Sequence, residues 1–271
     1  MPYLSPALNV MVAAARKAGR PLIRDFGEIE NLQISMKGPA DFVTNADERT
    51  ERILIEELSR ARPGYPIFAE ESGKHDGPDK SHRFIIDPID GTTNFLHGVP
   101  VFAISIALER EGQLVTALIF NPVTDELYVA EKGHGAYLND KRLRVAGRKS
   151  LNETLMATGI PFMGRGTDAE RDRSLAEVKA VVSRTSGIRR FGSAALDLAC
   201  VAAGRFDAFW ERGLNAWDIA AGILLVREAG GVVSDLDGQA DPLKNGDVLA
   251  ANEQLHPQLL KILKEAQSSG S

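Results

Sequence analysis

The stretch FIIDPIDGTTNF at residues 84–95 ends an apolar run in two aspartates. Its first three residues are aromatic or aliphatic, which is typical of a short buried strand. Asp87 follows them directly, and Asp90 comes soon after. Because burying even one unpartnered carboxylate costs much free energy, something positive must compensate for two. The stretch is therefore either a surface turn, where Asp and Gly are common, or a metal site.

The backbone between the two aspartates favours the metal site. Pro88 restricts that backbone, which could aim both carboxylates and the carbonyl oxygen of Ile89 into one pocket. Hard cations such as Mg²⁺ prefer oxygen ligands of this kind and keep several waters. The five histidines and the single cysteine, Cys200, form no cluster with zinc spacing. We therefore expect a site for a hard cation.

The residues after Asp90 suggest a second task for the same stretch. Gly91, Thr92 and Thr93 stand where a helix is expected to begin. The first N–H groups of a helix have no partner within it, and together with the helix dipole they favour a phosphate group. Two metal ligands beside a phosphate cradle are a far more specific combination than a pair of carboxylates alone.

Acidic residues end apolar elements at further places in the chain. Asp47 begins an expected helix, and Asp218 lies in AWDIAAG. Glu70 and Glu71 follow the strand-like PIFA. Each has an ordinary alternative, which is helix capping for the aspartates and a solvated acidic pair for the glutamates. Their joint occurrence favours one shared acidic site, to which the fold must bring Asp218 from the second half of the chain.

Composition limits the classes of function. The chain has 271 residues, 44% hydrophobic and 25% charged, which suits one large domain or two halves that share a site. A net charge of −5 gives no electrostatic footprint for direct nucleic-acid binding. A lone cysteine excludes an intrachain disulfide, so we expect a cytoplasmic protein. The start of the chain does not read as a signal peptide, and no stretch approaches the ~18 apolar residues of a membrane span.

The first half, residues 1–150, is expected to place helices on a mostly antiparallel sheet. Helices are expected at residues 6–26 and 44–60, with Thr44 as N-cap of the second. An exposed loop is expected at KGPAD, between the first strand and this helix. The remaining strands are expected in NLQISMKG, YPIFAEES, VFAISIALER, LVTALIFNP and ELYVAEKGHGAYLN, the last three forming a meander.

The second half, residues 151–271, alternates strands and helices, which implies helices that cover a sheet. The chain shows no internal repeat and no long linker. We expect one compact unit of two subdomains with the site between them. The expected elements are strands in TLMATGIP, GIRRFG, RFDAFWE, GVVSD and DVLAAN, and helices at about 168–183, 193–204, 216–231 and 253–266.

Taken together, these motifs resemble the inositol monophosphatase family of Mg²⁺-dependent, Li⁺-sensitive phosphatases. The resemblance rests on FIIDPIDGTTNFLHGVP and AWDIAAGILLVREAGG, supported by KGPADFVTNAD, IFAEES and FGSAALDLACVAAGRFDAFWERGL in the expected order. It spans about residues 5–265. It implies the layered αβαβα sandwich of the sugar phosphatases, two or three Mg²⁺ ions per site, inhibition by Li⁺, and a homodimer.

The resemblance also implies roles for particular residues near the metals. Glu70, Asp87 and the Ile89 carbonyl are implied as ligands of a first metal, and Glu70 as a contact to a third ion through water. Asp87, Asp90 and Asp218 are implied as ligands of a second metal. Asp47 and Thr92 are implied as the pair that polarises the attacking water.

A second set of implied residues holds the substrate. Gly91 and Thr93 are implied to bind its phosphate through backbone groups, beside Thr92. Ala194, Glu211, Asp90 and Asp218 are implied to face its alcohol, with Ser193 nearby. Lys37 lies on a loop that is implied to close over the metals.

The activity implied is hydrolysis of myo-inositol monophosphate by metal-activated water, without a phosphoenzyme. Related esters stay open, namely fructose 1,6-bisphosphate, 3′-phosphoadenosine 5′-phosphate and histidinol phosphate. Thr93, Asn94 and Phe95 favour the inositol branch. Asn215 and Ala216 stand where the animal enzymes have a His–Cys pair, which puts substrate preference, but not the chemistry, in doubt.

Other classes are less well supported. Asp235 and Asp237 in GVVSDLDGQ imitate the nucleophile turn of haloacid-dehalogenase-type phosphatases, but only 34 residues follow Asp237. KGHGAY is expected to be a hairpin turn rather than part of a dinucleotide-binding loop. A regulatory protein that binds the transcription machinery is a further alternative, although no basic patch supports it.

Overall fold

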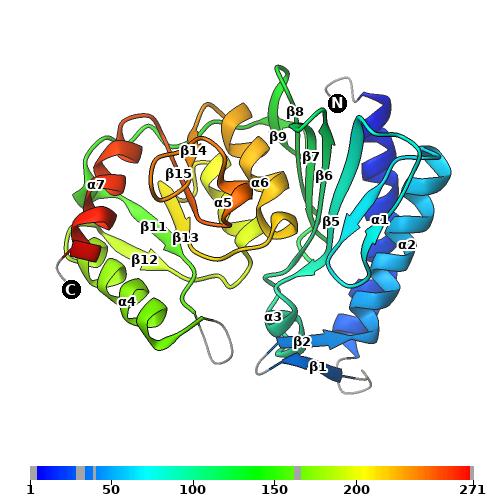
Figure 1. Cartoon of the computed structure of the whole chain (residues 1–271), viewed down its shortest axis with the longest axis horizontal. Coiled ribbons are helices and arrows are strands. Elements are labelled where there is room, and N and C mark those ends of the chain that lie inside the picture. The colour runs from blue at the N-terminus through cyan, green and yellow to red at the C-terminus, as the bar shows by residue number, and fades with distance from the viewer. Residues whose placement is uncertain (1–4, 29–33, 39–40, 162–165, 269–271) are drawn as a thin grey trace.

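The computed structural model describes residues 5–28, 34–38, 41–161 and 166–268. Its elements stack in five layers, helix–sheet–helix–sheet–helix, from α4 and α7 on one side to α1 and α2 on the other (Figure 1). This arrangement confirms the αβαβα sandwich that the resemblance implied. The predicted division of the chain at residue 150 falls in the connection between the two sheets and stays a prediction.

The larger sheet has eight strands and is mostly antiparallel. Its strand order is β10-β9-β8-β7-β6-β5-β3-β4, so consecutive strands β5 to β10 form a meander that includes the three segments expected to form one. Within the described part of the chain, β3 and β5 are the only strands of this sheet that pair in parallel. The strands are β3 (Ile67–Ala69), β4 (Gly73–His75), β5 (His82–Asp90), β6 (Ala103–Arg110), β7 (Gln113–Asn121), β8 (Glu126–Glu131), β9 (Gly135–Leu138) and β10 (Lys141–Arg142).

Helices α1 (Pro6–Gly27) and α2 (Asn45–Ala61) cover the outer face of this sheet. Both are amphipathic, and their apolar sides meet the sheet in one core cluster with Phe84 and Ile106. α2 begins with the predicted N-cap Thr44, which forms a capping box with Asp47. The cap fixes where this helix starts, and so where Asp47 lies.

The smaller sheet has five strands in the order β12-β11-β13-β15-β14. β11 pairs in parallel with both of its neighbours, whereas β15 is antiparallel to its two partners. Helices α4 (Asp168–Val182) and α7 (Leu255–Ser268) cover its outer face. The strands are β11 (Leu155–Thr158), β12 (Gly187–Arg189), β13 (Ala208–Glu211), β14 (Val232–Ser234) and β15 (Val248–Ala251).

Helices α5 (Ala194–Ala202) and α6 (Ala216–Glu228) form the middle layer between the sheets. Every residue of α5 is buried, and α6 is buried from Asp218 to Val226. A helix covered on both sides needs apolar residues all round, which explains their nearly continuous apolar sequences. The N-termini of both helices lie between the sheets. Charged residues there are buried and therefore need hydrogen-bonding or ionic partners.

Some local predictions were wrong or incomplete. Lys37 and Gly38 end β1 (Ile34–Gly38), in agreement with the strand predicted in NLQISMKG, whereas Asp41, which was assigned to the loop KGPAD, begins β2 (Asp41–Thr44) and pairs with Gly38. Residues 39–40 of that stretch lie outside the described residues. Short elements escaped the sequence analysis, because two or three residues show no periodicity: β4, β10 and the 3₁₀ turns η2 (Leu151–Glu153) and η3 (Pro242–Lys244). Within the described residues, no helix has the length and apolar character needed to cross a membrane.

Candidate active site

A cavity of about 510 Å³ lies where the end of β5 meets the N-termini of α5 and α6. Residues from both halves of the chain line it, as the sequence analysis expected. The predicted site residues in its wall are Glu70, Asp87, Ile89, Asp90, Gly91, Thr92, Thr93, Ser193, Ala194, Glu211 and Asp218.

A β-bulge in β5 brings Asp87 and Asp90 to the same side. In a regular strand, residues three apart point to opposite faces of the sheet. Here Asp87 pairs with Ser105 and Asp90 with Ala103, so β5 uses one residue more than β6 over this span. Such bulges redirect side chains, and Pro88, which lacks an N–H group, suits one. The sequence analysis attributed the convergence to Pro88 alone and missed the bulge.

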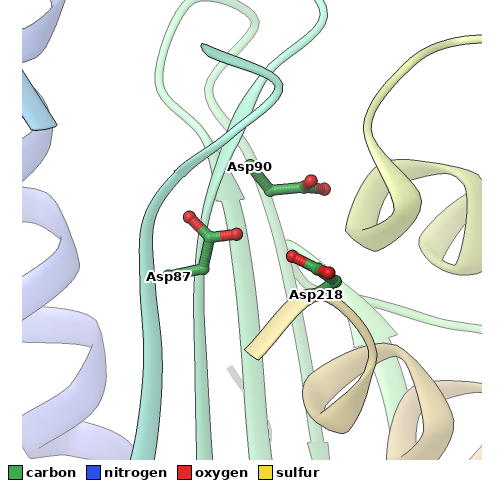
Figure 2. A group of neighbouring side chains, drawn as sticks. All are labelled: Asp87, Asp90 and Asp218. Atoms are coloured by element: carbon green, nitrogen blue, oxygen red, sulfur yellow. The ribbon is translucent and has the colours of Figure 1, made fainter. Parts of the chain in front are cut away.

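Asp218 completes an acidic triad with these two residues. One carboxylate oxygen of each of Asp87, Asp90 and Asp218 lies within 4.8 Å of the others. Figure 2 shows the three carboxylates converging, two from β5 and one from the start of α6. Asp218 is also the third residue of α6, where its Oδ2 accepts a hydrogen bond of 2.7 Å from the backbone N–H of Asn215. Helix capping and membership of the triad are thus compatible.

The electrostatics of the triad call for a cation. Burial raises the pKa of Asp87 well above its ordinary value, and the negative charges of Glu70, Asp90 and Asp218 raise it further. A hard divalent cation would reverse this effect, since it stabilises the ionised form of every carboxylate around it. The donor set consists of oxygen atoms alone, which fits Mg²⁺ and not a soft metal.

The N-terminus of α5 holds Asp90 in place. Asp90 Oδ2 accepts hydrogen bonds from the Ser193 hydroxyl at 2.6 Å and from the backbone N–H of Ala195 at 2.7 Å. Ser193 is the N-cap of α5. A carboxylate at this end of a helix is stabilised by the N–H groups and the helix dipole. A side chain of the larger sheet is thus fixed by the middle helix layer.

Asp47 and Thr92 form a hydrogen-bonded pair behind the cavity. The buried Asp47 accepts bonds at Oδ2 from the Thr44 N–H at 2.9 Å and the Thr44 hydroxyl at 2.6 Å. Its Oδ1 lies 3.2 Å from the Thr92 hydroxyl, which also lies 3.1 Å from the Ile89 carbonyl oxygen. Asp47 therefore caps α2 and contacts a residue of the cavity wall, so neither interpretation excludes the other.

Gly91 begins a helix, but a very short one. Its φ of 102° is left-handed, and it is the N-cap of α3 (Thr92–Leu96). The helix was expected to contribute a dipole to phosphate binding, yet five residues make little more than one turn. The backbone N–H groups at residues 91–93 are therefore the relevant feature here.

Three further predicted residues lie on different elements. Glu211 is the last residue of β13 and lies partly buried in the cavity wall, and Ala194 begins α5. Lys37 lies on β1, while its side chain lies outside the described part of the structure, so its predicted role has no further support here.

Sequence analysis missed the supporting contacts of Glu51 and Asn94 and the burial of Asp197. Buried Glu51 accepts the backbone N–H groups of Glu71 at 2.8 Å and Ser72 at 2.9 Å, which holds the turn that carries Glu70. The signal was its position on the buried side of α2, one turn after Asp47. Asn94 joins the halves of the chain, since its amide donates to the carbonyl oxygens of Val101 and Phe191, both at 2.7 Å.

Asp197 is the third missed residue, and it lies buried on α5. Burial raises its pKa well above the ordinary value, as do the charges of Glu211 and Asp90, while Arg190 opposes the shift. Arg190 is the one basic residue among the described residues in the cavity wall. Its charge thus offsets part of the acidic character of the site.

Comparison with known proteins gives a consistent picture. The model of the family described as "Inositol monophosphatase family" matches residues 3–268. The chain is 58% identical to an inositol-1-monophosphatase of Mesorhizobium japonicum, over 98% of each chain. It is 44% identical to the Nus factor SuhB of Pseudomonas aeruginosa, over 96% of this chain and 97% of that one. The crystal structure of the extragenic suppressor protein suhB from Bartonella henselae superposes with a TM-score of 0.93, at 52% identity, over 96% of this chain and 99% of that one.

Proposed function

This chain belongs to the inositol monophosphatase family, phosphatases that hydrolyse phosphate monoesters, and we propose that its substrate is myo-inositol monophosphate and its cofactor Mg²⁺. The observation that carries the proposal is the acidic triad in the wall of a 510 Å³ cavity. The names of relatives at 52% to 58% identity, all inositol-1-monophosphatases, support the choice of substrate.

Two groups of oxygen ligands would hold the metal ions. Glu70, Asp87 and the Ile89 carbonyl would hold the first, and Asp87, Asp90 and Asp218 the second. A third ion would contact Glu70 through water. Bound Mg²⁺ supplies a water of lowered pKa and offsets negative charge on the phosphate and on the leaving oxygen.

Thr92 and Asp47 would orient the attacking water. The Thr92 hydroxyl donates toward Asp47, so its oxygen lone pairs can accept a hydrogen bond from a water in the cavity. This pairing directs the water oxygen at phosphorus and draws proton density toward the Asp47 carboxylate. As the water oxygen attacks in line and forms its bond to phosphorus, the bond from phosphorus to the alcohol oxygen would break. The proton of the water would leave by way of Asp47 to solvent, and the departing alcohol oxygen would take up a proton from a water, which gives the free alcohol and inorganic phosphate. No side-chain nucleophile is required, so the reaction would invert configuration at phosphorus.

The remaining wall would bind the two ends of the substrate. Backbone N–H groups at Gly91 and Thr93, beside Thr92, would hold phosphate oxygens. Ala194 and Glu211 would face the alcohol, with Ser193, Asp90 and Asp218 close by. A carboxylate such as Glu211 accepts several hydrogen bonds at once, which suits a ring that carries many hydroxyl groups.

Phosphate release from four esters, with and without Mg²⁺, tests this proposal. The panel is inositol 1-phosphate, fructose 1,6-bisphosphate, 3′-phosphoadenosine 5′-phosphate and histidinol phosphate. We expect Mg²⁺-dependent turnover that favours inositol 1-phosphate and is lost in Asp90→Asn. Asp125→Asn is the matched control, because Asp125 is exposed on the surface and its φ of 51° suits Asn. Preference for another ester would change the substrate but keep the mechanism.

A regulatory role is the second candidate, because relatives at 40% to 46% identity are named Nus factor SuhB. Binding to transcription factors of RNA polymerase in a pull-down, together with no turnover of any ester, would favour it over catalysis. We further propose a cytoplasmic homodimer that binds no nucleic acid directly and is inhibited by Li⁺. Light scattering, a nucleic-acid binding assay and Li⁺ titration test these points.

A further inference from the structure

The carboxylate of Glu211 lies directly against the backbone of Gly159 in the cavity wall. A Cβ atom added to Gly159 would lie 1.8 Å from Cδ of Glu211, and 1.9 and 2.1 Å from its two carboxylate oxygens. These are the three nearest atoms, and no folded protein tolerates such distances. Any other residue at position 159 would therefore displace this carboxylate.

The glycine is needed for space and not for its backbone conformation. The φ of Gly159 is not positive, so an L-residue could adopt its backbone angles. Mobile surface loops often keep glycine for its left-handed conformation, and that reason does not apply here. What remains is the volume that the carboxylate of Glu211 fills.

The strand register brings Gly159 close to Glu211. β11 and β13 run in parallel with Thr158 beside Trp210. Gly159 directly follows the end of β11, and Glu211 is the last residue of β13. The buried Thr158 hydroxyl can donate to the Trp210 carbonyl oxygen at 2.8 Å or to that of Gly159 at 3.0 Å, so it lies between the two strand ends. Because the three atoms nearest to an added Cβ all belong to the end of the Glu211 side chain, an added side chain would move that end.

We propose that Gly159 is a positioning residue whose missing side chain leaves the carboxylate of Glu211 where it can select a polyhydroxylated alcohol as the leaving group. This inference rests on the proposed function, in which Glu211 faces the alcohol. Both residues line the cavity, near the apolar Ile160 and Leu214. A displaced carboxylate would lose its hydrogen bonds to ring hydroxyls while the acidic triad, which lies on other elements, stays in place.

The test compares two esters that share the phosphate but differ in the alcohol. Inositol 1-phosphate carries ring hydroxyls, whereas p-nitrophenyl phosphate has none on its leaving group. The selectivity ratio is kcat/KM for inositol 1-phosphate divided by kcat/KM for p-nitrophenyl phosphate. Because the hydrogen bonds to the charged Glu211 would be lost, this ratio should fall about tenfold to a hundredfold in Gly159→Ala. Glu211→Ala should lower the ratio by a similar factor. The double variant Gly159→Ala/Glu211→Ala should be no worse than Glu211→Ala.

Gly147→Ala is the matched control. Its added Cβ meets nothing within 4 Å, and its φ is not positive, so it should keep the wild-type ratio. Thermal unfolding and half-saturation by Mg²⁺ separate positioning from misfolding, since Gly159→Ala should leave both near the values of Gly147→Ala.

Three results would overturn the inference: an unchanged ratio in Gly159→Ala, an unchanged ratio in Glu211→Ala, or an equal further loss when Gly159→Ala is added to Glu211→Ala. If the wild type turns over neither ester with Mg²⁺, the proposed function itself fails, and the inference falls with it. The two failures are therefore distinguishable.

Discussion

Replacing Asp87 with Asn should stabilise the metal-free protein while it abolishes activity. Asp87 is buried beside two carboxylates whose oxygens lie within 4.8 Å of its own. At that distance, two negative charges repel each other by about 1 kcal/mol in water and about 3.5 kcal/mol at an effective permittivity of about 20. Asn keeps the oxygen that accepts the Ile89 N–H at 2.9 Å, so the bulge should persist. We expect a gain of about 1 to 3 kcal/mol in the free energy of unfolding, near neutral pH and without metal.

The effect has a definite pH dependence. The pKa of Asp87 in the folded protein is raised above its ordinary value of 3.8 by burial and by its acidic neighbours. Between these two pKa values the folded state binds more protons than the unfolded state, so stability falls as pH rises. The advantage of Asp87→Asn should therefore be small near pH 4 and should grow toward the raised pKa. With saturating Mg²⁺ the order should reverse, because the wild type gains the metal-binding free energy and the variant gains little.

Urea unfolding at several pH values, in chelator and in Mg²⁺, measures this difference. Asp125→Asn removes only an exposed ion pair with Arg16, so its stability should stay within about 1 kcal/mol of the wild type. The reasoning would be refuted if Asp87→Asn destabilised the metal-free protein, or if its advantage did not depend on pH.

Substitutions at three other residues probe the support of the site. Thr92→Val should lower kcat about 10² to 10⁴-fold with little change in KM, whereas Thr92→Ser should keep most activity; equal losses in both would contradict the role of the hydroxyl. Glu51→Ala leaves the N–H groups of Glu71 and Ser72 without their acceptor, so denaturation should show a loss of about 2 to 4 kcal/mol, and Mg²⁺ titration weaker half-saturation. Asn94→Ala should also weaken Mg²⁺ binding. Asn94→Asp should weaken it more, because a carboxylate oxygen would replace the N–H₂ group that faces the carbonyl oxygens of Val101 and Phe191. A smaller effect of Asp than of Ala would contradict the role of these two hydrogen bonds.

Part of the fold could be predicted from sequence because helices α1 and α2 are capped and amphipathic. Thr44 with Asp47 is a capping box that any reader of the sequence can recognise, and the structure has it. The order of the layers could not be derived from periodicity, since nothing in AWDIAAG says which sheet its helix will face. That part came from resemblance to a family.

The candidate site also has features that the sequence predicts and features that it does not. Paired aspartates after a strand predict a cation, because buried charge needs compensation wherever the strand lies. The bulge that aims Asp87 and Asp90 depends on pairing with β6, which the sequence of β5 alone does not specify. The local sequence around Glu51 does not distinguish it from other helical glutamates, because its partner Glu71 lies in a distant turn. Contacts between distant segments are what pattern analysis cannot provide.

Asp90 belongs to one sheet, but its hydrogen-bond donors belong to the helix layer that carries the other half of the chain. The hydrogen bonds of Asp90 therefore connect the two halves of the chain at the proposed cation site. Because linkage is reciprocal, whatever separates the two halves must weaken cation binding by the same factor by which a bound cation resists their separation. The fraction of sites that hold a cation and the free energy needed to separate the two halves of the chain are thus linked through one equilibrium.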